Sequence, residues 1–150
     1  PLDLPRWRSQ VTLVAQDAPM LQGSVGENLA FPFRQACSGD RNGNRDRRQT
    51  LLEHVGLGGI PEDRDVRTLS GGERHRLALV RGLMWNPPVL VADEPLSGLD
   101  EDMAEGCFQL LLDFAHRPGH GVLCVLHDRS TGARADRSLG LGSDIKGTSP

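Results

Sequence analysis

Three short apolar runs, each followed at once by a polar side chain, most constrain the fold of this chain. The runs and the polar residues that follow them are 11–15 with Gln16, 89–92 with Asp93 and Glu94, and 122–126 with His127. A run that is apolar throughout is typical of a strand buried on both faces of a parallel sheet. The carboxyl ends of parallel strands meet at one edge, where ligands bind in open α/β sheets. The sequence therefore predicts an α/β fold that gathers an amide, two acids and an imidazole at one sheet edge.

A turn with two glycines precedes the second apolar run, and residues 69–73 read LSGGE. Ser70 and Glu73 have the three-residue spacing of a capping box, which predicts a helix start. Gly71 and Gly72 fall in its first turn, where each weakens a helix by up to about 1 kcal/mol relative to alanine. Bare backbone at a helix start lets a phosphate approach the unpaired N–H groups there. The turn therefore predicts a phosphate-binding helix start.

The order and spacing of these segments resemble the ATP-binding subunits of ABC transporters, from Trp7 to about Leu141. The matching segments are 69–73 (signature), 89–94 (Walker B strand), 97–100 (D-loop), Gln16 (Q-loop glutamine) and His127 (switch histidine). Within this family, residues 7–16, 23–25 and 27–32 are most similar to the small bacterial ATPases paired with Fet-type permeases implicated in iron export.

The resemblance implies ATP hydrolysis with ATP and Mg²⁺ as cofactors, and it assigns roles to single residues. Asp93 and Gln16 would serve the metal, Glu94 would be the general base, and His127 and Gln16 would complete the catalytic set. The residues expected to contact ATP held by a second subunit, or to organise that contact, are Ser70, Gly71, Gly72, Glu73 and Asp100.

The resemblance also implies the architecture, the C-terminal part of a P-loop NTPase (RecA-like) parallel sheet core with an inserted α-helical signature subdomain. The expected parts are 1–16 (core strand and Q-loop), 17–86 (helical subdomain), 87–141 (core) and a tail at 142–150. Expected partners are a second ATPase subunit, forming a homodimer, and a transmembrane permease docked between Gln16 and Leu69. Phe31, Pro32 and Phe33 either contact that permease or belong to the core.

A P-loop is absent from the sequence. That loop needs a lysine after a glycine in the pattern G-x-x-x-x-G-K-[ST]. The single lysine, Lys146, follows Ile145 and lies beyond the last expected strand. We therefore expect this chain to be the C-terminal part of a longer protein, inactive alone because it lacks its own phosphate cradle.

Composition narrows the functional classes. A net charge of −3 gives no reason to expect nucleic-acid binding, and no apolar run approaches the roughly 18 residues of a membrane span. Cys37, Cys107 and Cys124 form no C-x-x-C pair, so neither a disulfide framework nor a zinc site is implied. These features favour a reducing cytosol, and the resemblance implies a cytoplasmic protein held at the inner face of a bacterial plasma membrane only through its permease.

Local patterns predict the remaining elements. Helices are expected after Ser24, from 48 to 55 with an end at Gly56, from 73 to 85, and after Ser97 as a cap. The last of these carries an apolar stripe formed by Leu99, Met103, Cys107, Leu110 and Phe114. Residues 35–48 are expected to form a loop, and 137–141 a weak strand. The arginines interpreted as solvated surface are Arg41, Arg45, Arg47 and Arg48, and the histidines interpreted as structural or exposed are His54 and His75.

Two other functions remain open at this point. A soluble ABC ATPase of DNA repair, chromosome maintenance or translation would share the catalytic motifs, although the chain has neither long heptad repeats nor a zinc module. A non-catalytic fragment that binds or regulates a partner would account for the missing P-loop.

Overall fold

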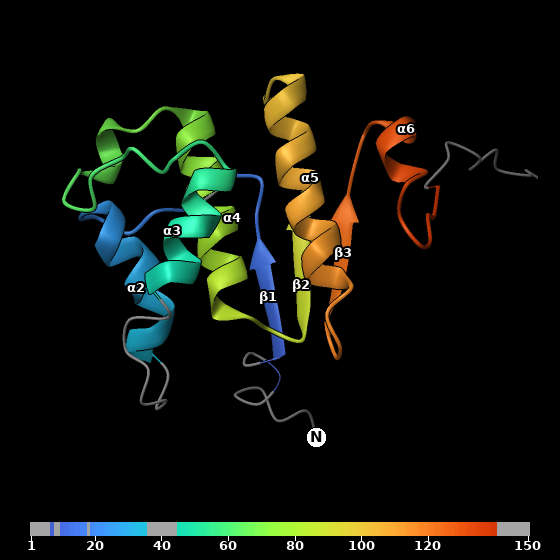
Figure 1. Ribbon diagram of the computed structural model, residues 1–150, viewed down its shortest axis with the longest axis horizontal. Coiled ribbons are helices and arrows are strands. Elements are labelled where there is room, and N and C mark those ends of the chain that lie inside the picture. The colour runs from blue at the N-terminus through green and yellow to red at the C-terminus, as the bar shows by residue number, and fades with distance from the viewer. Residues whose placement is uncertain (1–6, 8–9, 18, 36–44, 141–150) are drawn as a thin grey trace, which may run out of the picture.

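The computed structural model describes residues 7, 10–17, 19–35 and 45–140. A three-stranded parallel sheet lies beside a group of helices, as Figure 1 shows. Its strands are β1 (Val11–Val14), β2 (Val89–Asp93) and β3 (Gly121–Val125), in the spatial order β1-β2-β3. The predicted α/β class and the three predicted strands are confirmed.

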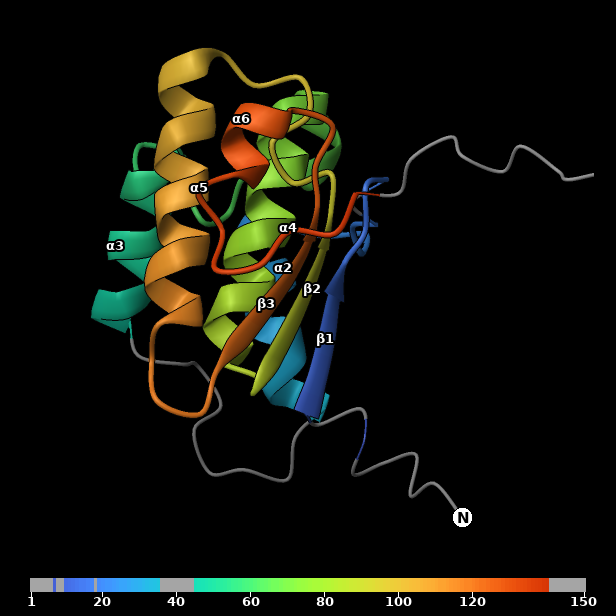
Figure 2. The same cartoon turned by 90° about the vertical axis from the view of Figure 1, so that its right-hand side faces the viewer.

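The two faces of this sheet differ in burial. Leu13, Val91 and Leu123 stand opposite one another in register, and Leu13 and Leu123 are each 63% exposed. The alternate positions Val14 and Leu90 are buried beneath helices. The prediction of strands buried on both faces is therefore wrong for the described residues, whose helices cover one face (Figure 2).

Helix α4 (Gly71–Trp85) packs against β1 and β2 and begins at the predicted capping box. The Ser70 Oγ accepts the Glu73 N–H at 3.1 Å, and the Glu73 carboxylate accepts the Ser70 N–H at 2.7 Å. Near its other end, Gly82 lies so close to the sheet that a Cβ there would meet Val14 Cγ2 at 2.7 Å. This close approach sets the position of α4 on the sheet.

Two further helices pack on or near α4. Helix α2 (Val25–Gln35) begins with a second capping box, formed by Ser24 and Glu27. Helix α3 (Arg45–His54) begins three residues earlier than predicted and is followed by Gly56 in the left-handed conformation, with φ 67°. A 3₁₀ turn, η1 (Val66–Thr68), leads into the signature and was not predicted. It is held by Asp65, which accepts the Arg67 N–H.

The arginines at the start of α3 are not simply solvated, which corrects the sequence interpretation. Arg47 donates to the Leu83 carbonyl and the Asn86 side chain at 2.9 Å each, which ties α3 to the end of α4. Arg48 forms an ion pair with Glu62 at 2.6 Å. Hydrogen bonds and ion pairs between elements leave no periodic signal in a sequence, so the sequence pattern could not predict them. Arg41 lies outside the described residues.

Helix α5 (Glu101–Ala115) packs on β3, and Asp100 caps it. The Asp100 carboxylate accepts the Met103 N–H at 2.9 Å. The prediction of Ser97 as the cap is wrong, because Ser97 lies in a turn where its N–H donates to the Glu94 carbonyl. The apolar stripe is confirmed, with Cys107 and Phe114 buried.

The chain after β3 differs from the prediction. Helix α6 (Arg129–Gly132) is capped by Asp128. Residues 137–140 belong to no strand, so the expected last strand is wrong within the described part of the chain, and Leu141 falls outside it. Isolated apolar residues here lack the neighbours that a strand needs.

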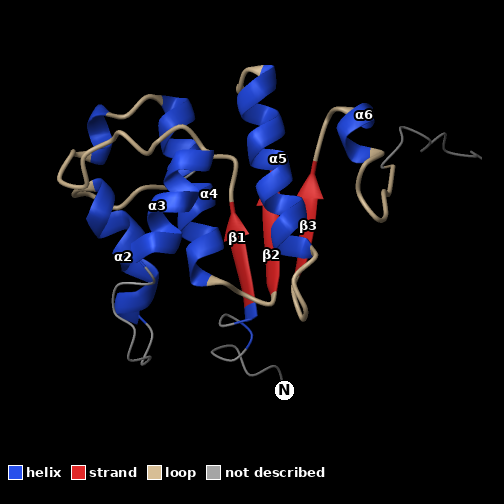
Figure 3. Cartoon of the chain, in the orientation of Figure 1, coloured by secondary structure: helices blue, strands red, loops and turns tan. Residues whose placement is uncertain are grey.

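Several smaller expectations are also settled. Phe33 is a core residue, with its ring edge-on to Trp85 at 6.0 Å, whereas Phe31 remains 37% exposed. Burial raises the pKa of the Cys107 thiol to about 11, which makes it unreactive. Within the described ranges, every helix is too short or too polar to span a bilayer. Figure 3 shows the division between helices, strands and loops.

Candidate functional site

The three strand tips meet at one edge of the sheet, as the apolar runs predict. The Gln16 Nε2 donates to Glu94 Oε2 at 2.8 Å, and the His127 Nε2 lies 2.5 Å from Glu94 Oε1. Gln16 follows β1, Glu94 follows β2, and His127 follows β3. We call these three residues the rim cluster. Residues 78 and 33 positions apart in sequence are thus joined through one carboxylate.

Glu94 has a strained backbone, with φ at 49° in the left-handed region. Such a conformation is uncommon for residues other than glycine and persists where the surroundings enforce it, often at functional sites. The Glu94 N–H donates to the Val125 carbonyl at 3.2 Å, which fixes the turn to β3. The sequence carries no signal for this conformation.

The exposures within the rim cluster suit acid–base chemistry. The Glu94 side chain is 18% exposed, whereas the His127 side chain is 80% exposed. A carboxylate at a sheet edge with an imidazole in contact can take a proton from a nearby water. Both Glu94 oxygens are engaged in the structure, one by Gln16 and the other by His127.

Asp93, the last residue of β2, directly precedes Glu94 and is a candidate metal ligand. It is partly buried, and its negative charge adds to burial in raising the pKa of the Cys124 thiol to about 11. The described residues hold no group of three or more His, Cys, Asp or Glu side chains suited to a metal ion. Mg²⁺ is held by one or two carboxylates together with substrate phosphates. The oxygens of Asp93 and Gln16 therefore fit a phosphate-bridged Mg²⁺, but not a closed metal cage.

The signature turn faces outward. Ser70 and Gly71 are exposed, and a Cβ added to Gly71 would meet nothing within 4 Å. Packing within the chain therefore does not require glycine at this position. Hydrogen bonds from the Ser70 backbone and hydroxyl are the main reason that the pKa of Glu73 lies below its usual range, so Glu73 stays ionised at the helix start. Bare N–H groups at this helix start are open to an anion from outside.

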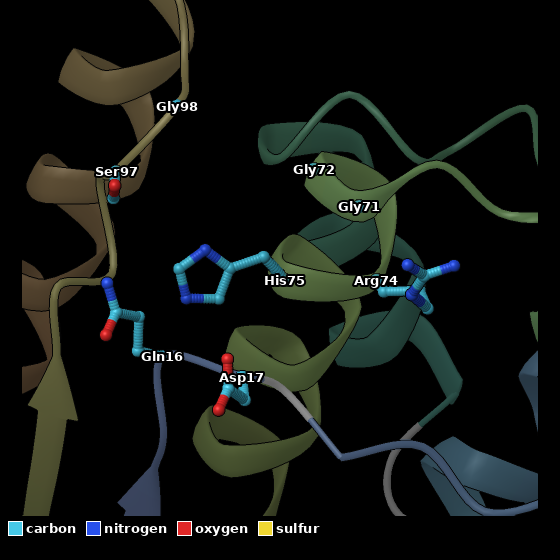
Figure 4. A pocket seen from close by; sticks show the side chains of 8 residues that line it. All are labelled: Gln16, Asp17, Gly71, Gly72, Arg74, His75, Ser97 and Gly98. Carbon is cyan, nitrogen blue, oxygen red and sulfur yellow. The ribbon is translucent and has the colours of Figure 1, made fainter.

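A cavity of about 280 Å³ separates the signature turn from the rim cluster; we call it the rim cavity (Figure 4). Its lining residues are Gln16, Asp17, Gly71, Gly72, Arg74, His75, Ser97 and Gly98. Figure 4 shows the His75 side chain pointing from α4 into the cavity, toward Gln16. Gln16 is therefore the one residue that belongs to both the rim cluster and the cavity.

The structure does not bring together every predicted site residue. Asp100 and Glu73 are each occupied at a helix start, and no described contact joins either to the rim cluster. The sequence interpretation missed Asp17, Arg74 and His75 as cavity residues. Only the one-turn spacing between Gly71 and His75 could have indicated that His75 shares a face with the signature turn.

A family model described as ABC transporter matches residues 2–97 of this chain. Among curated proteins, the lipoprotein-releasing system ATP-binding protein LolD of Shewanella sp. (strain MR-7) is 39% identical over 121 residues, 77% of this chain and 49% of the relative. LolD of Bordetella pertussis is 42% identical over 120 residues, again 77% of this chain and 49% of the relative. The chain thus spans about half the length of the curated relatives that it matches.

Solved structures agree. The ATP-binding cassette MJ0796, solved as a dimer in a post-hydrolysis state bound to ADP and Pi, matches with a TM-score of 0.71 and 30% identity over 86% of this chain and 57% of that one. A bacterial Atm1-family ABC exporter with ATP bound matches with a TM-score of 0.70 and 25% identity over 86% of this chain and 23% of that one.

These matches settle the family and correct its finer assignment. The named relatives are LolD ATPases and not the Fet-type ATPases expected from residues 7–32. Short segments such as these are shared between branches of a large family and do not separate them. On the family model and the folds that it matches, this chain belongs to the ABC transporter family.

Proposed function

We propose that the whole protein to which this chain belongs is the ATP-binding subunit of an ABC transporter and hydrolyses ATP. The observation that carries this proposal is the rim cluster, in which Glu94 contacts both Gln16 and His127. The P-loop that holds the ATP phosphates would lie in the half of the relatives' length that this chain does not match. A non-catalytic binding module gives no reason for a strained carboxylate between an amide and an imidazole.

In this proposal the residues at the sheet edge have separate roles in phosphoryl transfer. Asp93 and Gln16 would hold Mg²⁺, which would supply neutralisation of the charge on the transferred phosphoryl group. Glu94 would accept a proton from the attacking water once Gln16 and His127 release its oxygens. The exposed His127 imidazole would then hold the γ-phosphate and that water in line.

A second copy of the protein would complete the site. The exposed Ser70 and Gly71, with the partly exposed Gly72, would close over ATP held by the opposite subunit, with Glu73 fixing the helix start and Asp100 the subunit contact. The glycine at 71, which intrachain packing does not require, supports this arrangement. The dimeric state of the MJ0796 cassette supports it as well.

The proposed partner is a transmembrane permease, bound between Gln16 and Leu69 from the cytoplasmic face of a bacterial membrane. Leu21 and Phe31 are exposed apolar side chains there, 42% and 37% exposed. The names of the LolD relatives favour a lipoprotein-handling permease over the iron exporter that the sequence resemblance suggests. The permease, and not this subunit, would select the cargo.

Light scattering and phosphate release on the purified whole protein test the proposal. We expect Mg²⁺-dependent ATP hydrolysis and an ATP-driven shift from monomer to dimer, with the 150-residue chain alone inactive. Co-purification of a multi-span membrane protein would identify the permease and its cargo class. A monomer that neither shifts with ATP nor releases phosphate would leave the binding-module function standing instead.

A further inference from the structure

His75 is a buried polar side chain with incomplete bonding. Among the described residues, the buried side-chain atoms without a hydrogen-bond partner are Arg76 Nε and His75 Nε2. Only His75 lines the rim cavity, where it is 8% exposed and points toward Gln16 (Figure 4). Unpartnered buried polar atoms are few in native proteins, and each calls for a physical explanation.

The protonation state of His75 limits its possible partners. Burial lowers the pKa of this imidazole, so it is neutral near pH 7 and carries one N–H donor and one acceptor nitrogen. The charged residues that line the cavity with His75 are Asp17, after β1, and Arg74, on α4 itself, whose side chain points to the opposite side of α4 from His75 (Figure 4). Arg74 already donates to the Leu69 carbonyl at 2.8 Å.

The contact between Gln16 and Glu94 sets which way the Gln16 amide faces. The Gln16 Nε2 donates to Glu94 Oε2, which leaves the Gln16 Oε1 as an acceptor. A donor on the cavity side would match that oxygen. His75 and Ser97 are the neutral side-chain donors among the described residues of the cavity wall, and of the two only His75 comes from the helix that begins at the signature turn.

We propose that His75 is a positioning residue that donates its Nε2–H to Gln16 Oε1 when the rim cavity closes. The resulting contact links α4 through His75 to Gln16, the residue that contacts Glu94 in the structure. It fixes the orientation of the Gln16 amide and transmits the position of the signature helix to the proposed base. This role rests on the proposed function, because it acts on the residues assigned to hydrolysis.

A double-mutant cycle in the whole protein tests the proposal, with kcat and KM for Mg–ATP as readouts. His75→Leu should lower kcat by about 10-fold, as loss of an outer partner does at metal sites, with KM little changed. His75→Gln should restore kcat, since an amide keeps a neutral donor. In a Gln16→Ala background, His75→Leu should cause no further loss. The matched control His54→Leu, at an exposed histidine on α3, should leave kcat unchanged.

Each other outcome overturns the role. A kcat for His75→Leu equal to wild type, or an equal fractional loss with and without Gln16, would mean that His75 acts only through packing. If His75→Leu does not fold, His75→Asn replaces it, because its shorter amide cannot reach Gln16 and should show the same loss.

Ring-nitrogen NMR of His75 needs no turnover and separates this role from the proposed function. Mg²⁺ and ATP should fix the Nε2–H tautomer in the wild type and not in Gln16→Ala; identical spectra would overturn the contact. A wild type without Mg–ATP hydrolysis would overturn the proposed function by itself.

Discussion

Glu94 combines an unfavourable backbone conformation with the central place in the rim cluster. A left-handed residue with a side chain costs about 1–2 kcal/mol relative to the right-handed form. The contacts to Gln16, to His127 and to the Val125 carbonyl hold it there. A carboxylate placed in this way is aimed across the sheet edge at both neighbouring strand tips.

Replacing Glu94 by glycine or by alanine separates strain from chemistry. Both variants should lose ATP hydrolysis, but Glu94→Gly should be more stable to urea than Glu94→Ala by about 1 kcal/mol, because glycine accepts positive φ without strain. Equal unfolding midpoints for the two variants would show that the left-handed backbone is not a constraint here.

Two matched capping boxes allow a second test at the residue scale. Ser70→Ala and Ser24→Ala should each lower the free energy of unfolding by about 1 kcal/mol, since each removes a helix cap. Only Ser70→Ala should also weaken ATP-driven dimerisation, measured by light scattering. Equal dimerisation by both variants would contradict a binding role for the signature turn.

Helix α4 connects the outward signature turn with the sheet. One end presents Gly71 to the outside, and near the other end Gly82 fits against β1. Arg81 donates to the Pro19 carbonyl at 2.8 Å, which ties the same helix to the segment that follows Gln16. A displacement of α4 would therefore change the shape of the rim cavity.

The glycines of α4 give opposite expectations when replaced by alanine. Gly82→Ala should destabilise the protein by about 1–3 kcal/mol, because its Cβ would clash with Val14 Cγ2. Gly71→Ala should leave stability unchanged or raise it by up to about 1 kcal/mol while lowering ATP-driven dimerisation. Thermal unfolding measures the stability effects of both variants. A Gly82→Ala variant as stable as the wild type would contradict the close packing of α4 on the sheet.

Signals local in sequence predicted most elements. Apolar runs gave the three strands, and serine–glutamate spacing gave the starts of α2 and α4. The same local rules placed the start of α5 wrongly, because Ser97 and Asp100 are both good caps and only the turn after Glu94 decides between them. The contacts of Arg47 and the position of His75 in the cavity wall depend on segments that are far apart in sequence. A local periodicity cannot predict them.

As a whole, the described part of the chain is a sheet with helices on one face. Leu13, Leu123 and Val125 line the other face and are exposed. Apolar surface gathered in this way marks an interaction site. We propose that the part of the relatives' length that this chain does not match would pack on this surface.

Acid should destabilise the whole protein partly through His75. Burial lowers its folded pKa below the ordinary value of about 6.5, so the unfolded chain binds more protons. The contribution of the neutral, buried His75 to the free energy of unfolding is therefore complete above about pH 6.5. It is lost as the pH falls toward the pKa of His75 in the folded protein. Urea unfolding between pH 8 and about pH 5 should show a smaller decline for His75→Gln than for wild type. Equal slopes would contradict the burial of this imidazole.

Single-turnover hydrolysis by Glu94→Gln in the whole protein is the most direct test that Glu94 is the general base of the rim cluster. Glutamine keeps the shape of the side chain but cannot take a proton from water. We expect this variant to bind Mg–ATP and dimerise, while hydrolysis falls by about 100-fold or more. Hydrolysis at the wild-type rate would contradict the assignment of the rim cluster as the catalytic site.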